Sequence, residues 1–156
     1  MGAEERLAQL KLELPAAPKP VATYVTAMRV GDLLYVSGHG PAQDGAAKRL
    51  VEGKVGSDLT VAQGKESARL VGLNILSSVR DTIGSLDKVK RLVKTLGLVN
   101  CTAEFKDQPL VINGFSELMA EVFGEDAGVG ARSAVGTNAL PMNIPVEIEC
   151  IFEVET

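Results

Sequence analysis

One arginine and two glutamates near the C-terminus have the clearest capacity for chemistry. Arg132 begins the small, apolar run ARSAV, and Glu147 and Glu149 alternate with apolar residues in VEIEC. A guanidinium in such a run must pair with an acid, reach water or bind an anionic ligand, because burying it unpaired is costly. A nearby carboxylate is either its ion-pair partner or a base that orients water. The pattern therefore leaves a structural ion pair and a ligand site as alternatives.

A hairpin would bring these residues together. If residues 132–136 and 145–149 pair as antiparallel strands around Ala139-Leu140, Arg132 and Glu147 lie opposite each other on one face. Glu149 shares the face of Glu147, because side chains alternate along a strand. It is therefore the natural control for any role of Glu147.

The other candidate groups carry weaker patterns. His39, the only histidine, lies between two glycines in an expected loop, where it is either solvated or part of a site wall that titrates near neutrality. A GxGxxG-like string starts at Gly38, but position 43 is Gln and no helix follows, which argues against dinucleotide binding. Cys101 and Cys150 adjoin apolar strands and are expected to be packing thiols. Two cysteines and one histidine show no metal-ligand spacing.

Composition narrows the functional classes. The chain has 156 residues, which suggests one domain with a substantial core. It is 46% hydrophobic but only 4% aromatic, and its net charge is −4. An acidic balance without a basic cluster opposes binding to nucleic-acid phosphates, and few aromatics can stack on bases. No apolar run reaches membrane-spanning length and the N-terminus lacks an apolar signal core, so we expect a cytoplasmic protein.

Local patterns predict the elements of the first half. The proline-rich run at 15–20 acts as a linker that divides an N-terminal extension, 1–20, from a domain at 21–156. Residues 1–14 can form one or two helical turns. The β-like runs 21–30 and 33–38 flank Gly31-Asp32, which predicts a hairpin. Thr60 and Gln63 form a capping-box pattern before a long amphipathic helix that ends near Gly84.

The second half predicts a strand, a helix and two more strands. Residues 89–99 form the strand, with 89, 91, 93, 95 and 97 on one face and Leu92, Leu96 and Leu98 on the other. A helix starts after Asp107 and stops at Gly124, and strands follow at 131–135 and 145–154. This order is α+β, most simply one sheet with both helices on one face. We expect other subunits to bury the second face.

Several of these segments resemble the Rid/YjgF family of reactive-intermediate deaminases, whose older annotation is endoribonuclease. The resemblance covers residues 21–154 and is most specific in GARSAV, followed by LPMNIPVEIE; YVTAMRVGDLLYVSG, SLDKVKRLVKTLGLVN and INGFSELMAEVFG add to it. It implies a chorismate-mutase-like fold and a homotrimer. It also implies clefts between subunits, where 2-imino or 2-enamino acids are hydrolysed to 2-keto acids and ammonia without metal or cofactor.

The resemblance also implies a set of site residues. Arg132 would bind the substrate carboxylate, backbone groups near Ser37 and Gly38 would hold the far end of the substrate, and Glu147 would accept a proton from water. The full set is Tyr24, Ser37, Gly38, Asn113, Arg132 and Glu147, with His39 as a further wall of the site. On residue type alone, Tyr24 is more often a packing residue, and Asn113 is more often a surface polar residue than a ligand contact.

The chain departs from the family pattern at three places. Ala134 stands where a cysteine is common, His39 follows Ser-Gly where glutamine is usual, and Tyr24-Val25-Thr26 replaces Tyr-Ser-Gln. These differences leave the substrate side chain open. A trimer that only binds a keto acid is the alternative function. A ribonuclease is less favoured, since the chain has one histidine and no basic stripe.

Overall fold

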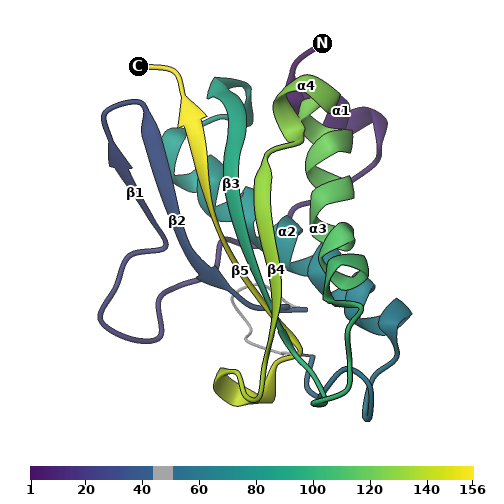
Figure 1. Cartoon of the computed structure of the whole chain (residues 1–156). Helices are drawn as coiled ribbons and strands as arrows, with labels where there is room; N and C mark the ends of the chain where they lie inside the picture. Colours follow the sequence, from purple (N-terminus) through teal and green to yellow (C-terminus); the bar gives the residue numbers. More distant parts are fainter. Residues whose placement is uncertain (44–50) are drawn as a thin grey trace.

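Five strands form one mixed sheet, which is one of the two layers of the molecule (Figure 1). The computed structural model describes residues 1–43 and 51–156. The strands are β1 (Ala27–Val30), β2 (Leu33–His39), β3 (Val89–Asn100), β4 (Ala131–Thr137) and β5 (Val146–Val154). Their spatial order is β1-β2-β5-β3-β4, in which β3 and β4 run parallel and all other neighbours run antiparallel. The predicted α+β class, with one mixed sheet, is confirmed.

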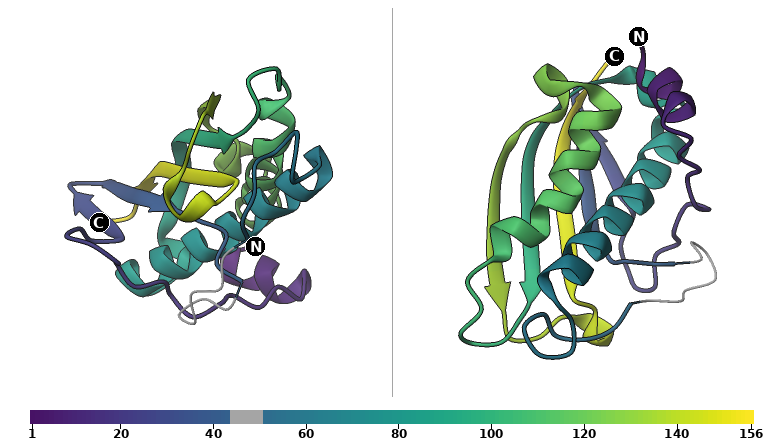
Figure 2. Two further views of the ribbon diagram at one scale, coloured as in Figure 1. Left: turned by 90° about the horizontal axis from the view of Figure 1, so that it is seen from below. Right: turned by 90° about the vertical axis from the view of Figure 1, so that its right-hand side faces the viewer.

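Two long helices cover one face of the sheet, as the right-hand view of Figure 2 shows. Helix α2 (Val61–Ile83) packs on β2 and β5, and α3 (Gln108–Phe123) packs on β3 and β4. The predicted capping box is present at Thr60, and Gly84 ends α2 in a left-handed conformation. The shorter elements are α1 (Ala3–Gln9), α4 (Glu125–Gly128) and the 3-10 turns η2 (Leu86–Lys88) and η3 (Pro141–Asn143).

The core lies between these two helices and the sheet. It is aliphatic, with few aromatic rings, and its largest fully buried side chains are Phe115, Phe152, Leu34, Ile75, Leu76, Leu86, Ile112, Leu118, Met119 and Ile148. The helices touch backbone to backbone at Gly114, where an added Cβ would overlap the carbonyl oxygen of Lys65. This close approach fixes the position of α3 above β3 and β4.

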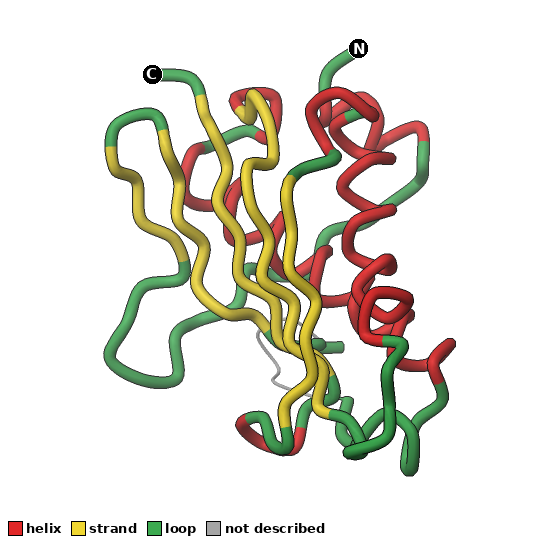
Figure 3. The backbone as a smooth tube through the Cα atoms, viewed as in Figure 1, coloured by secondary structure: helices red, strands yellow, loops and turns green. Residues whose placement is uncertain are grey.

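The first hairpin is confirmed but shorter than predicted. Gly31 has a φ of 60°, which a tight turn needs and glycine adopts without steric cost. The ladder with β2 begins only at Ala27, so the prediction of a strand from residue 21 is wrong. Local hydrogen bonds replace that ladder: the Tyr24 N–H donates to the Ala22 carbonyl, and Ser37 Oγ donates to the Val25 carbonyl. Residues 20–26 form part of the large loop beside β1 in Figure 3.

The predicted hairpin between residues 132–136 and 145–149 is wrong. Strand β3 lies between β4 and β5 and pairs with both of them. The cause is the crossover through α3: a strand that returns after a helix pairs parallel to the strand before that helix. The chain then passes through η3 to reach β5 on the far side of β3 (Figure 1).

The predicted faces of β3 are correct for only part of the strand. Thr95 and Gly97 face the helices and Leu96 and Leu98 face away, as expected, but Leu92 is buried on the helix side with Thr95. The register of β3 against β5 shifts between residues 92 and 94, where an extra residue reverses the alternation. Strict period-two patterning cannot predict such a bulge.

The face of the sheet away from the helices exposes apolar side chains. Met28, Tyr35, Val93 and Val135 are between 38% and 56% exposed. Contiguous apolar surface of this kind is typical of a contact with another protein chain. Burial of this face against other subunits therefore stays a prediction.

The N-terminal segment lies along the helical layer. Leu7 of α1 is buried, Glu4 pairs with Arg80 of α2, and Ser77 Oγ donates to the Pro15 carbonyl at 2.7 Å. The helical turns predicted within residues 1–14 are present as α1. The domain boundary at residue 20 stays a prediction. Within the described residues, no helix is long and apolar enough to cross a membrane.

Candidate functional site

A cleft of about 670 Å³ lies beside the C-terminal end of β2 and the start of β5. We call it the Glu147 cleft. It contains five of the predicted site residues: Tyr24, Ser37, Gly38, His39 and Glu147. Its other walls are Pro18, Lys19, Val21, Ala22, Thr26, Gly40, Ala42, Leu98, Pro141, Met142, Ile144 and Glu149. Arg132 and Asn113 lie elsewhere.

Glu147 is a half-buried carboxylate on the face of the sheet away from the helices. Burial, followed by the nearby charge of Glu149, raises the pKa of Glu147 above its ordinary value. Its carboxyl group lies against Gly38, where an added Cβ would come within 3.0 Å of Oε1. Glycine at position 38 therefore leaves the space that this carboxylate occupies, and a base of raised pKa is suited to accept a proton near neutral pH.

Hydrogen bonds tie the end of β2 to the loop that precedes β1. Ser37 binds the preceding loop, since its Oγ donates to the Val25 carbonyl at 2.6 Å and its N–H donates to the Thr26 carbonyl at 2.9 Å. The register with β5 shifts between Val36 and His39. A bulge of this kind redirects the backbone, and it places Ser37 and Gly38 in the wall of the cleft.

His39 is buried, so the expectation of a solvated loop histidine is wrong. It ends β2 on the helix side and is 5% exposed. Its Nδ1 lies 2.6 Å from the Ser37 carbonyl oxygen, which can only accept, so Nδ1 carries a proton. In the neutral ring, Nε2 then accepts from the Ser78 hydroxyl at 2.7 Å. Burial lowers the pKa of His39, although its bond to the Ser37 carbonyl opposes that shift.

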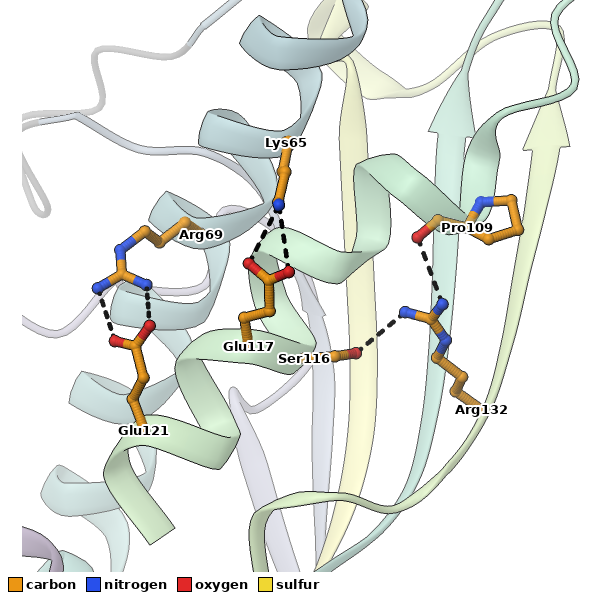
Figure 4. Close-up of polar contacts among 7 residues, drawn as sticks. All are labelled: Lys65, Arg69, Pro109, Ser116, Glu117, Glu121 and Arg132. Atoms are coloured by element: carbon orange, nitrogen blue, oxygen red, sulfur yellow. Dashed lines mark hydrogen bonds and ion pairs between the residues drawn. The ribbon is translucent and has the colours of Figure 1, made fainter. Parts of the chain in front are cut away.

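Arg132 lies on the edge strand β4 and faces α3. Its Nη1 donates to Ser116 Oγ at 3.1 Å and its Nη2 donates to the Pro109 carbonyl at 3.3 Å, as Figure 4 shows. Both acceptors are neutral, and Arg132 forms no ion pair within the described part of the chain. The alternative that Arg132 is a structural partner of Glu147 or Glu149 is therefore wrong within one chain. A guanidinium has five N–H donors, so these two bonds leave capacity for an anion.

The two glutamates of α3 form ion pairs with α2 and not with Arg132. Glu117 pairs with Lys65 and Glu121 pairs with Arg69, both on α2, in the contacts drawn in Figure 4. These two ion pairs join the helices and leave Ser116 as the side chain of α3 that holds Arg132.

Asn113 shares a helix face with the two groups that bind Arg132. Residues 109, 113 and 116 are spaced four and three apart on α3, which places them on one stripe of the helix. Asn113 is half-buried there. Arg132 and Asn113 therefore form a second cluster, which we call the Arg132 cluster.

Arg132 and Glu147 lie on opposite faces of the sheet. Arg132 is in register with Thr95 of β3, on the helix side, whereas Glu147 is in register with Leu98, on the other side. Two strand spacings across and three residues along separate their Cα atoms by roughly 14 Å. One small ligand cannot contact both side chains of the same chain.

Tyr24 is 42% exposed. It therefore does not pack in the core of a single chain, which its residue type made the more frequent role. It lines both the Glu147 cleft and a neighbouring groove that crosses the outer face of the sheet. Its position between the two makes it accessible to a ligand and to a neighbouring chain.

Sequence reasoning missed several residues of both clusters. Ser78 and Ser116 support His39 and Arg132, and only their helical spacing could have indicated that they face the sheet. Residues of the N-terminal segment and of η3 also line the Glu147 cleft, namely Pro18, Lys19, Val21, Ala22 and Met142, although the proline-rich run predicted only a linker. Long-range packing brings these segments to the site, and local patterns carry no information about it.

Cys101 and Cys150 are buried free thiols, as predicted, and burial raises the pKa of Cys150. No group of three or more His, Cys, Asp or Glu side chains in residues 1–43 and 51–156 is placed to hold a metal ion.

Comparisons with known proteins agree with this fold. The family described as "YjgF/chorismate_mutase-like, putative endoribonuclease" matches residues 4–153. Protein TCP17 of Trypanosoma cruzi is 40% identical over 147 residues, which cover 94% of this chain and 91% of TCP17. The crystal structure of Atu1372 from Agrobacterium tumefaciens, a protein of unknown function, has a TM-score of 0.88 and 43% identity, covering 98% of this chain and 92% of that one.

A more distant relative has a named activity. The 2-iminobutanoate/2-iminopropanoate deaminase of Dermatophagoides farinae is 27% identical over 156 residues, which cover 92% of this chain and 95% of the deaminase.

The buried His39 predicts a pH dependence of stability. Its pKa is lowered in the folded state, so below about pH 6.5 the unfolded chain binds a proton that the folded chain does not. The free energy of unfolding should fall as pH drops through this window, by up to about 1.4 kcal/mol per pH unit. His39→Gln should remove this contribution. Urea unfolding of both proteins from pH 7.5 to 5 measures it, and parallel curves would contradict the assignment.

Proposed function

The chain belongs to the YjgF/chorismate-mutase-like family, and we propose that it hydrolyses 2-imino or 2-enamino acids to 2-keto acids and ammonia. The observation that carries the proposal is Arg132, which is fixed by two neutral acceptors and keeps further donors for a carboxylate. The activity named for the Dermatophagoides farinae relative supports the same reaction. The Arg132 cluster would bind the carboxylate of the substrate and orient it.

Glu147 would supply the base. The carbon of a protonated imine is electrophilic, so the protein needs only to position a water molecule and accept its proton. Water adds to this carbon while Glu147 takes the proton, and the proton then passes to the nitrogen of the tetrahedral adduct. Glu147, again a carboxylate, then takes the hydroxyl proton of the adduct while the C–N bond breaks, so that ammonia leaves and the carbonyl of the keto acid forms. The raised pKa of Glu147 favours this exchange of protons.

We propose that two copies of the chain complete the site. Arg132 lies at the β4 edge on the helix side, and Glu147 lies in a cleft on the other face. A second copy can bring its Glu147 cleft to the Arg132 cluster of the first, which one chain cannot do alone. A homotrimer repeats this contact three times with closed symmetry, and the apolar outer face of the sheet provides surface for assembly.

Imine hydrolysis is favoured over RNA cleavage by two observations. The only histidine is buried against Ser78, where it cannot act on an RNA strand, and the net charge is −4. Binding of a keto acid without catalysis uses the same residues. Assays of imine hydrolysis and of keto-acid binding on one preparation separate these two alternatives.

Arg132→Ala should abolish most imine hydrolysis while the fold persists. Losing one charge-assisted pair in a shielded site costs on the order of 2 to 5 kcal/mol, or roughly thirty-fold to several thousand-fold in kcat/KM. Arg132→Lys should also lose much of the activity, because lysine lacks the planar fork. Arg69→Ala is the matched control, since it removes an arginine from a surface ion pair and should leave kcat/KM within about two-fold. A folded Arg132→Ala protein of full activity would refute the proposal that Arg132 binds the substrate carboxylate.

Glu147→Gln should remove the base and with it the acid limb of the pH–rate profile. In the parent protein this limb should lie above about pH 4.5, because the pKa of Glu147 is raised. Glu149→Gln is the control: it should remain active and move the limb to lower pH, since the neighbouring negative charge is gone. Measurements of kcat/KM from pH 4 to 8 test both. Equal activity of Glu147→Gln and parent would assign the base elsewhere.

A further inference from the structure

Residues 15–26, which we call the strap, form one wall of the Glu147 cleft. Pro18, Val21 and Ala22 line the cleft directly, and Tyr24 continues the wall toward β1. Val21 is 61% exposed in the single chain, although it is a large apolar residue. The exposed surface of Val21 faces the Glu147 cleft, so a ligand that enters the cleft can cover this side chain.

The strap is fastened to the helical layer before it reaches the cleft. Ser77 Oγ of α2 donates to the Pro15 carbonyl, while Leu12 and Leu14 pack against the core. Upstream, Glu4 bonds both Arg80 and the Leu86 N–H. At the other end, Ser37 binds the Val25 carbonyl. Anchors at both ends give the wall a defined position, and the prolines restrict the backbone between them.

The walls of the cleft differ in chemistry. Strands β2 and β5 contribute most of the polar groups, namely Ser37, His39, Glu147 and Glu149. The strap and the turn around η3 contribute mainly apolar residues: Pro18, Val21, Ala22, Pro141, Met142 and Ile144; Lys19 is the charged residue of the strap in this lining. A substrate that places its reacting carbon beside Glu147 therefore has an apolar surface available for its side chain. A three-carbon imino acid would leave that surface unused.

We infer that the strap is a specificity wall that receives a branched aliphatic side chain of the substrate. This inference rests on the proposed function, because it assigns the substrate of the same site. Its chemical basis is burial of apolar surface on both the side chain and the strap. The preferred substrates are then 2-imino acids with side chains of about four carbons, such as the imine derived from leucine, over the imine derived from alanine.

Val21→Trp tests the wall by filling the cleft from the strap. Imines are generated in situ from L-leucine and L-alanine by an amino-acid oxidase, and kcat/KM is measured for each. The parent should favour the leucine-derived imine by about ten-fold or more, since each apolar group placed in a pocket contributes about that factor. Val21→Trp should lower kcat/KM for the leucine-derived imine about ten-fold and change that for the alanine-derived imine less than two-fold.

Two further variants make the test specific. Leu10→Trp is the matched control, since Leu10 follows α1 in the helical layer, is 41% exposed and lies outside the lining of the Glu147 cleft, and it should change neither substrate. Ser77→Ala frees the strap from α2 without altering the lining. It should raise KM for the leucine-derived imine and leave KM for the alanine-derived imine unchanged.

Binding of the keto acids separates this inference from the proposed function. Calorimetry with pyruvate and 4-methyl-2-oxopentanoate on parent and Val21→Trp reports the cleft without catalysis. Hydrolysis of both imines with no selective effect of Val21→Trp overturns the specificity wall and leaves the proposed function standing. Selective keto-acid binding that Val21→Trp removes, without any hydrolysis, supports the wall and overturns the catalytic proposal. Neither binding nor hydrolysis overturns both.

Discussion

The insertion of β3 between β4 and β5 is the constraint on which the arrangement of the site depends. The crossover through α3 makes β4 pair parallel to β3, and this pairing sets Arg132 beneath α3, between Pro109 and Ser116. The same strand separates β4 from β5, and its register with both strands places Glu147 on the opposite face from Arg132. The two residues with the clearest capacity for chemistry are thus held apart by the fold itself. Each belongs to its own rigid cluster, and the function that we propose requires a second copy of the chain.

Close packing fixes the positions of the side chains in each cluster. At Gly114 the backbones of α2 and α3 touch, so α3 cannot shift without moving its contacts to Arg132. In the Glu147 cleft, the absence of a side chain at Gly38 admits the carboxylate, and the His39 ring joins the end of β2 to Ser78 of α2. These contacts use small or neutral groups. They leave the charges of Arg132 and Glu147 available for a ligand.

Short-range patterns in the sequence predicted the elements well. The capping box at Thr60, the turn at Gly31 and the helix stop at Gly84 are determined by neighbouring residues, and all three are present. The pairing of strands that are distant in the sequence was harder to predict. The hairpin expected between β4 and β5 follows from sequence proximity, whereas the real pairing depends on where α3 packs.

In the candidate site, too, the residue types could be predicted from the sequence, whereas their positions depend on long-range packing. Arg132 and Glu147 stood out by residue type, but their separation on two faces depends on the strand order. His39 looked like a loop residue because glycines flank it, and its burial depends on a bulge and on a serine 39 positions away. The strap looked like a linker because it is rich in proline. Its role as a wall arises from anchors on α2 that are more than sixty positions distant in the sequence.

Complementation between two inactive variants tests the shared site most directly. Chains carrying Arg132→Ala and chains carrying Glu147→Gln are co-expressed with separate tags, and the mixed oligomers are purified through both tags. A site built from two chains can combine the intact Arg132 of one with the intact Glu147 of the other, and in a trimer that contains both variants about one site in three has this combination. The account predicts recovery of imine hydrolysis to roughly that fraction of the parent rate. Mixed oligomers no more active than either variant alone would contradict it.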